Sequence, residues 1–521
     1  MTKRTEMKSL AKDTAVYGLS SIVGRFLNYL LVPLYTNVIS AQSGGYGIVT
    51  NLYAYVALIL VLLTFGMETT FFRFANKEDE NPRMVLKASL AIVGVLSAVF
   101  LLAVFLFIGP IAGVLGYVGK EAYIQMMACV VALDALQAIP FSYLRFKHKA
   151  IKFASLKMLF IVMNIGLNLL YFVWLGKTDV FYVFAINLVC TGFITFFFIP
   201  EMVGVFRPDA DATGTVAEME AATTPLTGTT AGATTAGATT GNGYMGLIRR
   251  MLGYSWPILV LGIAGILNQT ADKMLFPLVY PDKAQGTVEL GIYGACVKIA
   301  MIMAMITQAF RYAYEPIVFA KSKDADKREY YAQAMKYFVI FTLFAFLCVV
   351  GYMPWIEKII GADYRAGLNV VPIVMMAEIM MGVYFNLSFW YKLIDKTIWG
   401  AWFSLAGCAV LVAVNILFIP RFSYMACAWG GVAGYGTAML LSYFVGQKKY
   451  PIRYDLKGMF TYVVITVAFF FVMNDISSQF PVWARLLTNS LLIVVYLAVV
   501  VKQDLPLSAL PVVGRRFARK S

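Results

Sequence analysis

The sequence predicts an all-α polytopic membrane protein with about 14 transmembrane helices. Of its 521 residues, 60% are hydrophobic and 14% are charged, whereas about a quarter of a soluble chain is charged. The apolar residues form continuous blocks of about twenty, the length of a helix that crosses a hydrocarbon core. Transmembrane β-strands would instead alternate apolar and polar residues over about ten positions. The blocks therefore indicate helices.

The individual spans are bounded by charged or turn-forming residues. The predicted spans are residues 13–39, 46–73, 85–108, 121–143, 153–175, 180–200, 250–271, 290–317, 335–354, 367–391, 397–418, 424–446, 457–474 and 483–501.

The distribution of basic residues predicts the orientation. With the N-terminus inside, most of the 43 lysines and arginines fall in the inner segments, as the positive-inside rule expects. We therefore expect a multi-pass protein of a bacterial inner membrane with cytoplasmic N- and C-termini. Its net charge of +15 then faces anionic lipid at the cytoplasmic rim rather than nucleic acid. The basic N-terminus has no cleavage site after it, so the first span is expected to be retained.

One long inner segment divides six spans from eight. It is rich in Thr, Ala and Gly and repeats "TTAGA", so it has no apolar face to bury and is expected to be a flexible tether. The predicted organisation is an N-terminal six-helix lobe (1–206), the cytoplasmic tether (207–247), a C-terminal six-helix lobe (248–447), and two extra helices with a basic tail (448–521).

The two lobes resemble each other weakly in sequence. "LNYLLVPLYT" (27–36) is similar to "ADKMLFPLVY" (271–280), which aligns Pro33 with Pro277. Further on, "YGIVTNLYAYVALILVLLTFGMETTFFRFANKED" is similar to "YGACVKIAMIMAMITQAFRYAYEPIVFAKSKDAD". Because six spans precede the tether, both lobes begin inside. Repeats arranged in this way are related by an axis along the membrane normal.

Small and polar residues form a stripe on one face of the first span and of the seventh. Polar side chains inside spans seldom face lipid, so we expect them to face one another or a watered cavity between the lobes. The alternative is that they pair locally and hold helices together, with the small residues allowing close packing. The candidate cavity residues for binding substrate are Arg25, Asn28, Asn51, Gln269, Asp272, Lys298 and Gln308.

Four acids also lie within predicted spans. A carboxylate in a low dielectric is readily neutralised, so each can carry a proton, help to hold a sodium ion, or pair with a cation. Arg25 pairing with Glu68 or Asp134 is one such alternative. These ion-coupling or charge-pairing candidates are Glu68, Asp134, Glu315 and Glu378.

The opening residues resemble those of a known family. "YGLSSIVGRFLNYLLVPLYT", followed by "YGIVTNLYAYVALILVLLTFGMETTFFRF", is similar to the start of bacterial polysaccharide-repeat flippases of the O-antigen and capsule type. Their superfamily also contains multidrug extruders and lipid II flippases. The resemblance implies two six-helix lobes around a central cavity and two added C-terminal helices.

The resemblance also implies a function. An undecaprenyl-pyrophosphate-linked oligosaccharide would move from the inner to the outer leaflet for surface polysaccharide synthesis, with polysaccharide assembly proteins as candidate partners. Arg25 and Lys298 would hold the diphosphate between them, since guanidinium and ammonium groups bind phosphate. The alternatives are a lipid II flippase and an H⁺- or Na⁺-coupled multidrug exporter of the same superfamily.

Other functional classes are disfavoured by the sequence. The only histidine is His148, and the six cysteines are scattered through apolar segments without a CxxC pair, so neither a metal site nor a cofactor is expected. There is no GxxxxGK[ST] motif. The longest predicted outer loop, 272–289, is too short for a catalytic domain. We therefore do not expect an enzyme.

The composition of the tether leads to a test. We expect deletion of residues 212–241 to leave the membrane level of the protein and surface polysaccharide unchanged, because this stretch contributes no apolar face to a core. Immunoblotting of membranes and staining of surface glycan would measure both. Loss of glycan at a normal protein level would show that the tether has a function of its own.

Overall fold

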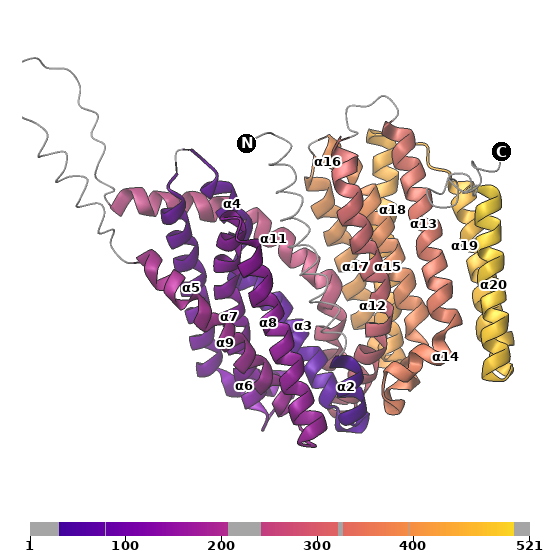
Figure 1. Ribbon diagram of the computed structural model, residues 1–521, viewed down its shortest axis with the longest axis horizontal. Coiled ribbons are helices and arrows are strands. Elements are labelled where there is room, and N and C mark those ends of the chain that lie inside the picture. Colours follow the sequence, from indigo (N-terminus) through magenta and orange to yellow (C-terminus); the bar gives the residue numbers. More distant parts are fainter. Residues whose placement is uncertain (1–30, 79, 207–240, 321–326, 395, 505–521) are drawn as a thin grey trace, which may run out of the picture. The chain divides into compact units, whose positions relative to one another are not determined.

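The computed structural model describes residues 31–504 apart from 79, 207–240, 321–326 and 395 (Figure 1). The described residues fold as helices, and no strand occurs among them. The predicted all-α class is therefore confirmed. The helices before the tether are α2 (Leu31–Val38), α3 (Gly45–Thr64), α4 (Met67–Ala75), α5 (Pro82–Leu106), α6 (Ile108–Leu115), α7 (Glu121–Phe146), α8 (Ala150–Leu169) and α9 (Phe181–Phe206).

The helices after the tether include two that are close to forty residues long. They are α11 (Gly241–Val279), α12 (Lys283–Ala320), α13 (Lys327–Gly351), α14 (Met353–Ile356), α15 (Val370–Leu387), α16 (Phe389–Leu393), α17 (Ile398–Phe422), α18 (Tyr424–Lys449), α19 (Leu456–Phe471) and α20 (Val482–Gln503).

Twelve helical stretches among the described residues are long and apolar enough to cross a membrane. They correspond to the predicted spans other than the first and the twelfth. The helix α18 covers the predicted twelfth span, 424–446, without being one of the twelve. Most of the predicted first span lies outside the described residues.

The predicted second span corresponds to the single stretch Gly45–Ala75, but the helix is interrupted within it. Phe65 and Gly66 both have left-handed backbone (φ 49° and 67°) and separate α3 from α4. A Cβ at Gly66 would also come within 3.0 Å of Ile258, so glycine suits the site on both counts. The predicted outer loop 272–289 is mostly helix, because α11 continues to Val279 and α12 begins at Lys283.

The described residues separate into two compact units. Unit 1 contains residues 56–174 and 181–263, and unit 2 contains residues 31–55, 175–180 and 264–504. The helices α3 and α11 each contribute residues to both units. The predicted lobes, 1–206 and 248–447, remain a division of the sequence, and the compact units differ from it in three segments. Residues 31–55 and 175–180 belong to unit 2, and residues 248–263 belong to unit 1.

Unit 1 has an apolar core of α4, α5, α7 and the first part of α11. Met67, Phe71, Val85 and Val131 are almost fully buried there. The hydroxyls of Thr70 and Ser255 lie 2.5 Å apart inside this core, so each satisfies the other.

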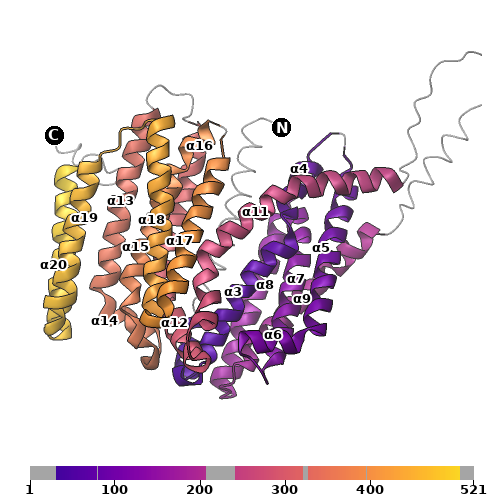
Figure 2. The ribbon, with the colours of Figure 1, turned by 180° about the vertical axis from the view of Figure 1, so that it is seen from behind.

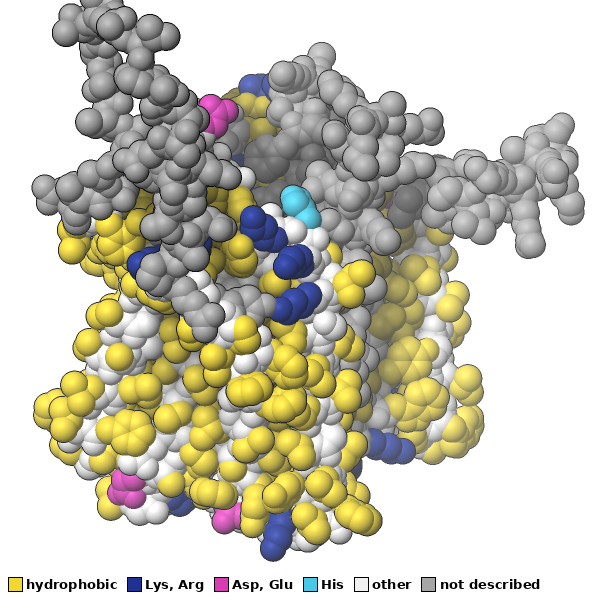
Figure 3. Space-filling view, turned by 60° about the vertical axis from the view of Figure 1, so that its left-hand side comes forward, with side chains coloured by type: hydrophobic (Ala, Val, Ile, Leu, Met, Phe, Trp, Pro, Cys, Tyr) yellow, Lys and Arg dark blue, Asp and Glu magenta, His cyan; other side chains and the backbone are white. Residues whose placement is uncertain are grey.

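The outer surface of unit 1 is apolar. Figure 3 shows a broad area of hydrophobic side chains between an upper group of Lys and Arg and a lower edge where charged side chains reappear. This is the pattern expected of a surface in contact with lipid. Exposed apolar side chains on α5, α8 and α9 include Val95, Val99, Leu102, Val162, Leu169 and Phe196.

Unit 2 is a bundle in which α12, α13, α15, α17 and α18 run alongside one another, with α19 and α20 at its edge (Figures 1 and 2). The helices α17 and α18 approach closely, since a Cβ on Gly407 would lie 2.7 Å from the carbonyl oxygen of Gly434. Small residues permit this approach, as in other membrane helices.

A charged cluster attaches the C-terminal helices to α13. The Lys336 ammonium donates to Asp504 at the end of α20 and lies 2.7 Å from Asp455, which caps α19. The hydroxyl of Tyr462 donates to the other Asp504 oxygen at 2.7 Å. The hydrogen bond from Lys336 lowers the pKa of Asp455. This contribution to stability is therefore present above the ordinary aspartate pKa and is lost as the pH falls below about 4.

We expect Lys336→Ala to destabilise the protein by about 1–2 kcal/mol, because two carboxylates lose their cation in a partly exposed site. The midpoint of thermal unfolding in detergent at pH 7 would measure this change. The control is Lys448→Ala, which removes an exposed lysine from the last turn of α18. Equal midpoints for the two variants would contradict the anchoring role of Lys336.

Candidate functional site

The clearest buried charge cluster in unit 2 is centred on Asp272 of α11. Both of its carboxylate oxygens accept hydrogen bonds at 3.0 Å from the ammonium of Lys273. One of them also accepts from the hydroxyl of Tyr293 on α12 at 2.7 Å. The Asp272 and Lys273 side chains are 10% and 20% exposed, so this ion pair is largely removed from water. Two charges that have lost their hydration are stabilised by close contact with each other and by further hydrogen bonds, here the one from Tyr293.

Two further charges lie close to this pair. Lys273 is within electrostatic range of Lys298 on α12 and of Glu378 on α15. Asp272 is within range of Glu378 as well. Two acids and two lysines from three helices thus share one region of unit 2. Because the cluster contains charges of both signs, its acids can bind and release a cation and its lysines an anion. The charges that are not engaged then compensate one another.

Asn51 has a structural role beside this cluster. Its side-chain amide donates to the carbonyl oxygen of Lys273 at 2.7 Å. In a regular helix that oxygen would accept from the N–H of residue 277, which is a proline and has none. Asn51 therefore satisfies an acceptor that Pro277 leaves without its helical donor. The hydroxyl of Tyr55, one turn further along α3, donates to the next carbonyl, that of Met274, at 3.3 Å.

The structure brings some of the predicted site residues together. Asn51, Asp272, Lys298 and Glu378 all belong to the neighbourhood of Lys273 in unit 2. Gln269 is an exposed residue whose backbone oxygen accepts from the Lys273 ammonium at 3.1 Å. Gln308 is partly buried ten residues beyond Lys298 on the same helix, about 15 Å along its axis.

Three predicted site residues are not described. Arg25 and Asn28 precede the first described residue, and the side chain of Glu315 also lies outside the described part. Their roles stay predictions.

Unit 1 contains a second mixed-charge cluster. Glu68 of α4 accepts a hydrogen bond at 3.1 Å from the guanidinium of Arg145 on α7, and Ser142 lies between them. Lys157 of α8 is within electrostatic range of Asp134, Glu68 and Arg145. Its ammonium lies 4.0 Å from the centre of the Phe141 ring. Glu68 and Asp134 thus have cations nearby within the described part of unit 1.

Sequence reasoning missed Lys273, Tyr293, Arg145 and Lys157. Lys273 was expected in an outer loop, although the acidic and basic neighbours "DK" between apolar residues were a signal of an internal pair. Arg145 and Lys157 lie near predicted span ends, where basic residues are expected for topological reasons alone.

Comparison with known proteins shows what this fold resembles. No protein-family model matches the chain, and no curated protein matches it in sequence. Among solved structures, "Lipid II flippase MurJ, inward closed conformation" matches with a TM-score of 0.65 at 12% identity, over 93% of this chain and 98% of that one.

Two multidrug transporter structures also match. An inward-facing multidrug resistance MATE family transporter of the MOP superfamily has a TM-score of 0.58 at 13% identity, over 81% of this chain and 93% of that one. The MATE multidrug transporter DinF-BH has a TM-score of 0.55 at 15% identity, over 84% of this chain and 96% of that one. The chain therefore has the fold of MOP-type transporters and is a multi-pass membrane protein.

The Asp272 pair leads to a test. We expect Asp272→Ala to lower stability by about 2–4 kcal/mol, because Lys273 loses its nearest counter-charge in a buried setting. The double variant Asp272→Ala/Lys273→Ala should be less destabilised than this single variant, since no charge is left alone. Thermal unfolding midpoints in detergent would measure both, with Asp272→Asn as the variant that keeps an acceptor for Tyr293. A double variant less stable than Asp272→Ala would contradict the pairing argument.

Proposed function

We propose that the chain is a flippase that moves an undecaprenyl-pyrophosphate-linked oligosaccharide from the inner to the outer leaflet for surface polysaccharide synthesis. The observation that carries the proposal is the likeness to a lipid II flippase over nearly the whole of both chains. The two MATE structures above cover less of this chain. The lipid flippase is thus the better template for a protein whose C-terminal pair, α19 and α20, follows the two lobes.

The charges inside unit 2 support an anionic substrate. Lys298 and Lys273 are two lysines within electrostatic range of each other, in the cluster that also contains Asp272 and Glu378, and a diphosphate would bind on the side of the two lysines. Arg25, predicted in the first span, would add a planar donor fork. Outward movement of an anion is also favoured by about 2.3 kcal/mol per charge per 100 mV when the cell interior is negative.

The same proposal implies a cellular location and partners for the protein. The protein would lie in the bacterial cell membrane with both termini cytoplasmic, and its basic rim would contact anionic lipid. Proteins of polysaccharide assembly would receive or supply the lipid-linked sugar.

Two alternative substrates have support of their own. Lipid II is supported by the name of the MurJ structure. A cationic drug exchanged for H⁺ or Na⁺ is supported by the acids Asp272 and Glu378 in unit 2 and by the two MATE structures. The substrate that purified protein moves in vesicles would distinguish the three.

We expect Lys298→Ala to reduce translocation of a fluorescent prenyl-pyrophosphate-linked sugar in proteoliposomes by at least about tenfold. A hydrogen bond to a charged group is worth about 1.5–3 kcal/mol, and 1.4 kcal/mol is a factor of ten. Arg25→Ala should have the same effect, and surface polysaccharide should disappear from cells that carry either variant.

Lys298→Arg, which keeps the charge, and Lys448→Ala, which removes an exposed one, are the controls. Normal transport and normal surface glycan in both alanine variants would refute the proposal that these cations hold the diphosphate.

A further inference from the structure

The helix α11 is longer than one membrane span requires. Its apolar stretch, Gly243–Val279, has 37 residues and is therefore about 55 Å long, whereas a hydrocarbon core is about 30 Å thick. Figures 1 and 2 show that the first part of α11 runs at a wide angle to α5, α7 and α9, which are candidate spans of unit 1. Pro257 follows this part, and helices bend at proline. Residues 243–256 are called the surface segment below.

One face of the surface segment is fixed to unit 1. Leu247 and Met251 are 4% and 0% exposed, and both belong to the apolar core that unit 1 builds from α4, α5 and α7. One turn further on, the hydroxyl of Ser255 meets that of Thr70 on α4. These three residues recur every four positions and therefore lie on one side of the helix. The packing thus determines which face of the surface segment points away from the protein.

The opposite face of the surface segment carries apolar residues and a cation. Met245, Arg249 and Trp256 are spaced by four and by seven residues, so they form one stripe on the side away from Leu247. Met245 and Trp256 are 63% and 60% exposed, and Arg249 is exposed as well. Helices that lie in the head-group layer of a membrane combine large apolar residues with Lys or Arg in this way, and Trp is enriched at that depth.

The surface segment continues the apolar surface that unit 1 presents to lipid. Phe196, Val203 and Phe206 are exposed on one face of α9, and this face runs to the last residue of the helix. There the ammonium of Lys87 lies 5.7 Å from the ring centre of Phe206 and 5.8 Å from that of Tyr244 in the surface segment. Lys87 thus joins the exposed end of α9 to the surface segment, so the two belong to one continuous area.

The charge of this area is complementary to one leaflet of the membrane. In the sequence, the tether joins the end of α9 to the start of α11, and the predicted orientation makes that side cytoplasmic. The cytoplasmic leaflet has a negative surface potential from its anionic lipids, which attracts Lys and Arg that lie close to it. Arg249 and Lys87 supply such cations beside the exposed apolar residues.

We propose that the surface segment lies in the head-group layer of the cytoplasmic leaflet and binds anionic phospholipid there. Met245 and Trp256 enter the boundary with the acyl chains, and Arg249 and Lys87 contact lipid phosphate. The bound lipid holds the first part of α11, and with it the core of unit 1, at a fixed depth in the membrane. The inference shares only the orientation of the protein with the proposed function and needs no transported substrate.

The first test measures the depth of the stripe. Spin labels are attached to Met245→Cys and Trp256→Cys in the full-length protein, in nanodiscs of phosphatidylcholine and phosphatidylglycerol. Collision of each label with oxygen, which concentrates in the acyl chains, is compared with collision with a water-soluble nickel complex. Val99→Cys on the apolar outer face of α5 is the lipid control, and Lys149→Cys, exposed just before α8, is the water control. The unchanged chain gives the background of the native cysteines.

We expect the oxygen-to-nickel collision ratio at both labelled positions to exceed that of Lys149→Cys by at least about threefold, because these side chains reach the acyl boundary. A ratio equal to that of Lys149→Cys would show that the stripe faces water and would overturn the proposal. Protection from both reagents would show that protein covers the stripe, and would overturn the lipid assignment as well.

The second test measures lipid binding without any cysteine variant. Native mass spectrometry follows phosphatidylglycerol and phosphatidylcholine on the full-length protein. We expect Arg249→Gln to weaken phosphatidylglycerol binding about fivefold and to leave phosphatidylcholine binding unchanged. Arg250→Gln is the matched control, because the Arg250 guanidinium already pairs with Glu80 at 2.6 Å. Unchanged binding in Arg249→Gln would overturn the lipid contact, and equal losses in both variants would show an effect of net charge instead of this stripe.

The failure of this inference is separable from the failure of the proposed function. If the labels at positions 245 and 256 face water, the surface segment is refuted even when Lys298→Ala abolishes transport. If the native protein moves no pyrophosphate-linked sugar but the labels lie at the acyl boundary and Arg249→Gln loses phosphatidylglycerol, the surface segment stands and the proposed function fails.

Discussion

The compensation of charge inside apolar helices is the constraint on which the rest of the structure depends. An ionised side chain in a spanning helix costs about 2.5–3.5 kcal/mol on insertion scales, so it needs partners. Asp272 has Lys273 and Tyr293, and Glu68 has Arg145 and Ser142. The first set joins α11 to α12 and the second joins α4 to α7, so charge compensation also links these helices to each other.

Most of the fold is predictable from the sequence because the helices are long and continuously apolar. Two features escaped prediction for physical reasons. The break at Phe65 and Gly66 has no proline to mark it, and glycine within an apolar run also serves close packing of helices. The extension of α11 through Pro277 was missed because two adjacent charges, Asp272 and Lys273, followed four residues later by a proline normally indicate a helix end.

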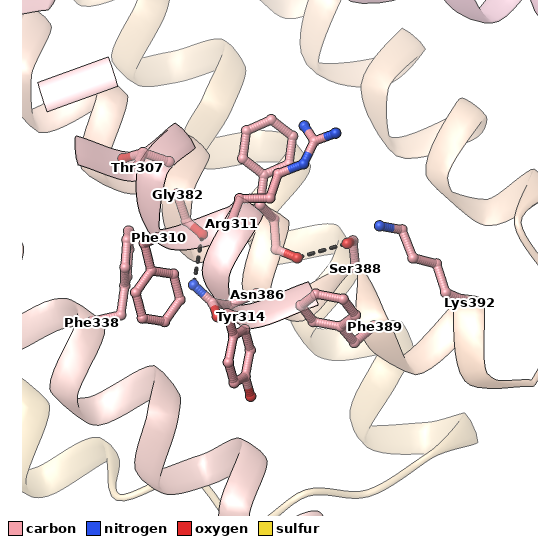
Figure 4. Close-up of a pocket in the computed structure, with 11 residues that line it drawn as sticks. Thr307, Phe310, Arg311, Tyr314, Phe338, Gly382, Asn386, Ser388, Phe389 and Lys392 are labelled. Atoms are coloured by element: carbon pink, nitrogen blue, oxygen red, sulfur yellow. Dashed lines mark hydrogen bonds between the residues drawn. The ribbon is translucent and has the colours of Figure 1, made fainter. Parts of the chain in front are cut away.

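The candidate site was only partly predictable. Asp272, Lys298 and Glu378 were recognisable as ionisable residues in apolar surroundings, and the structure places all three near Lys273. The small crevice beside Arg311 (Figure 4) was not recognisable, because its lining residues come from α12, α13, α15 and α16 and leave no periodic signal in any one of these helices.

The hydrogen bonds of Asn51 and Tyr55 to successive carbonyls of α11 have a mechanical consequence. A shift of one helix past the other by a single residue, or a turn of α3 about its own axis, would remove both bonds and leave the oxygen of Lys273 without a donor in an apolar environment. Within unit 2 these segments of α3 and α11 must therefore move as a single rigid pair in any conformational change that keeps both bonds. Strain from such a change would have to be absorbed elsewhere along the two helices.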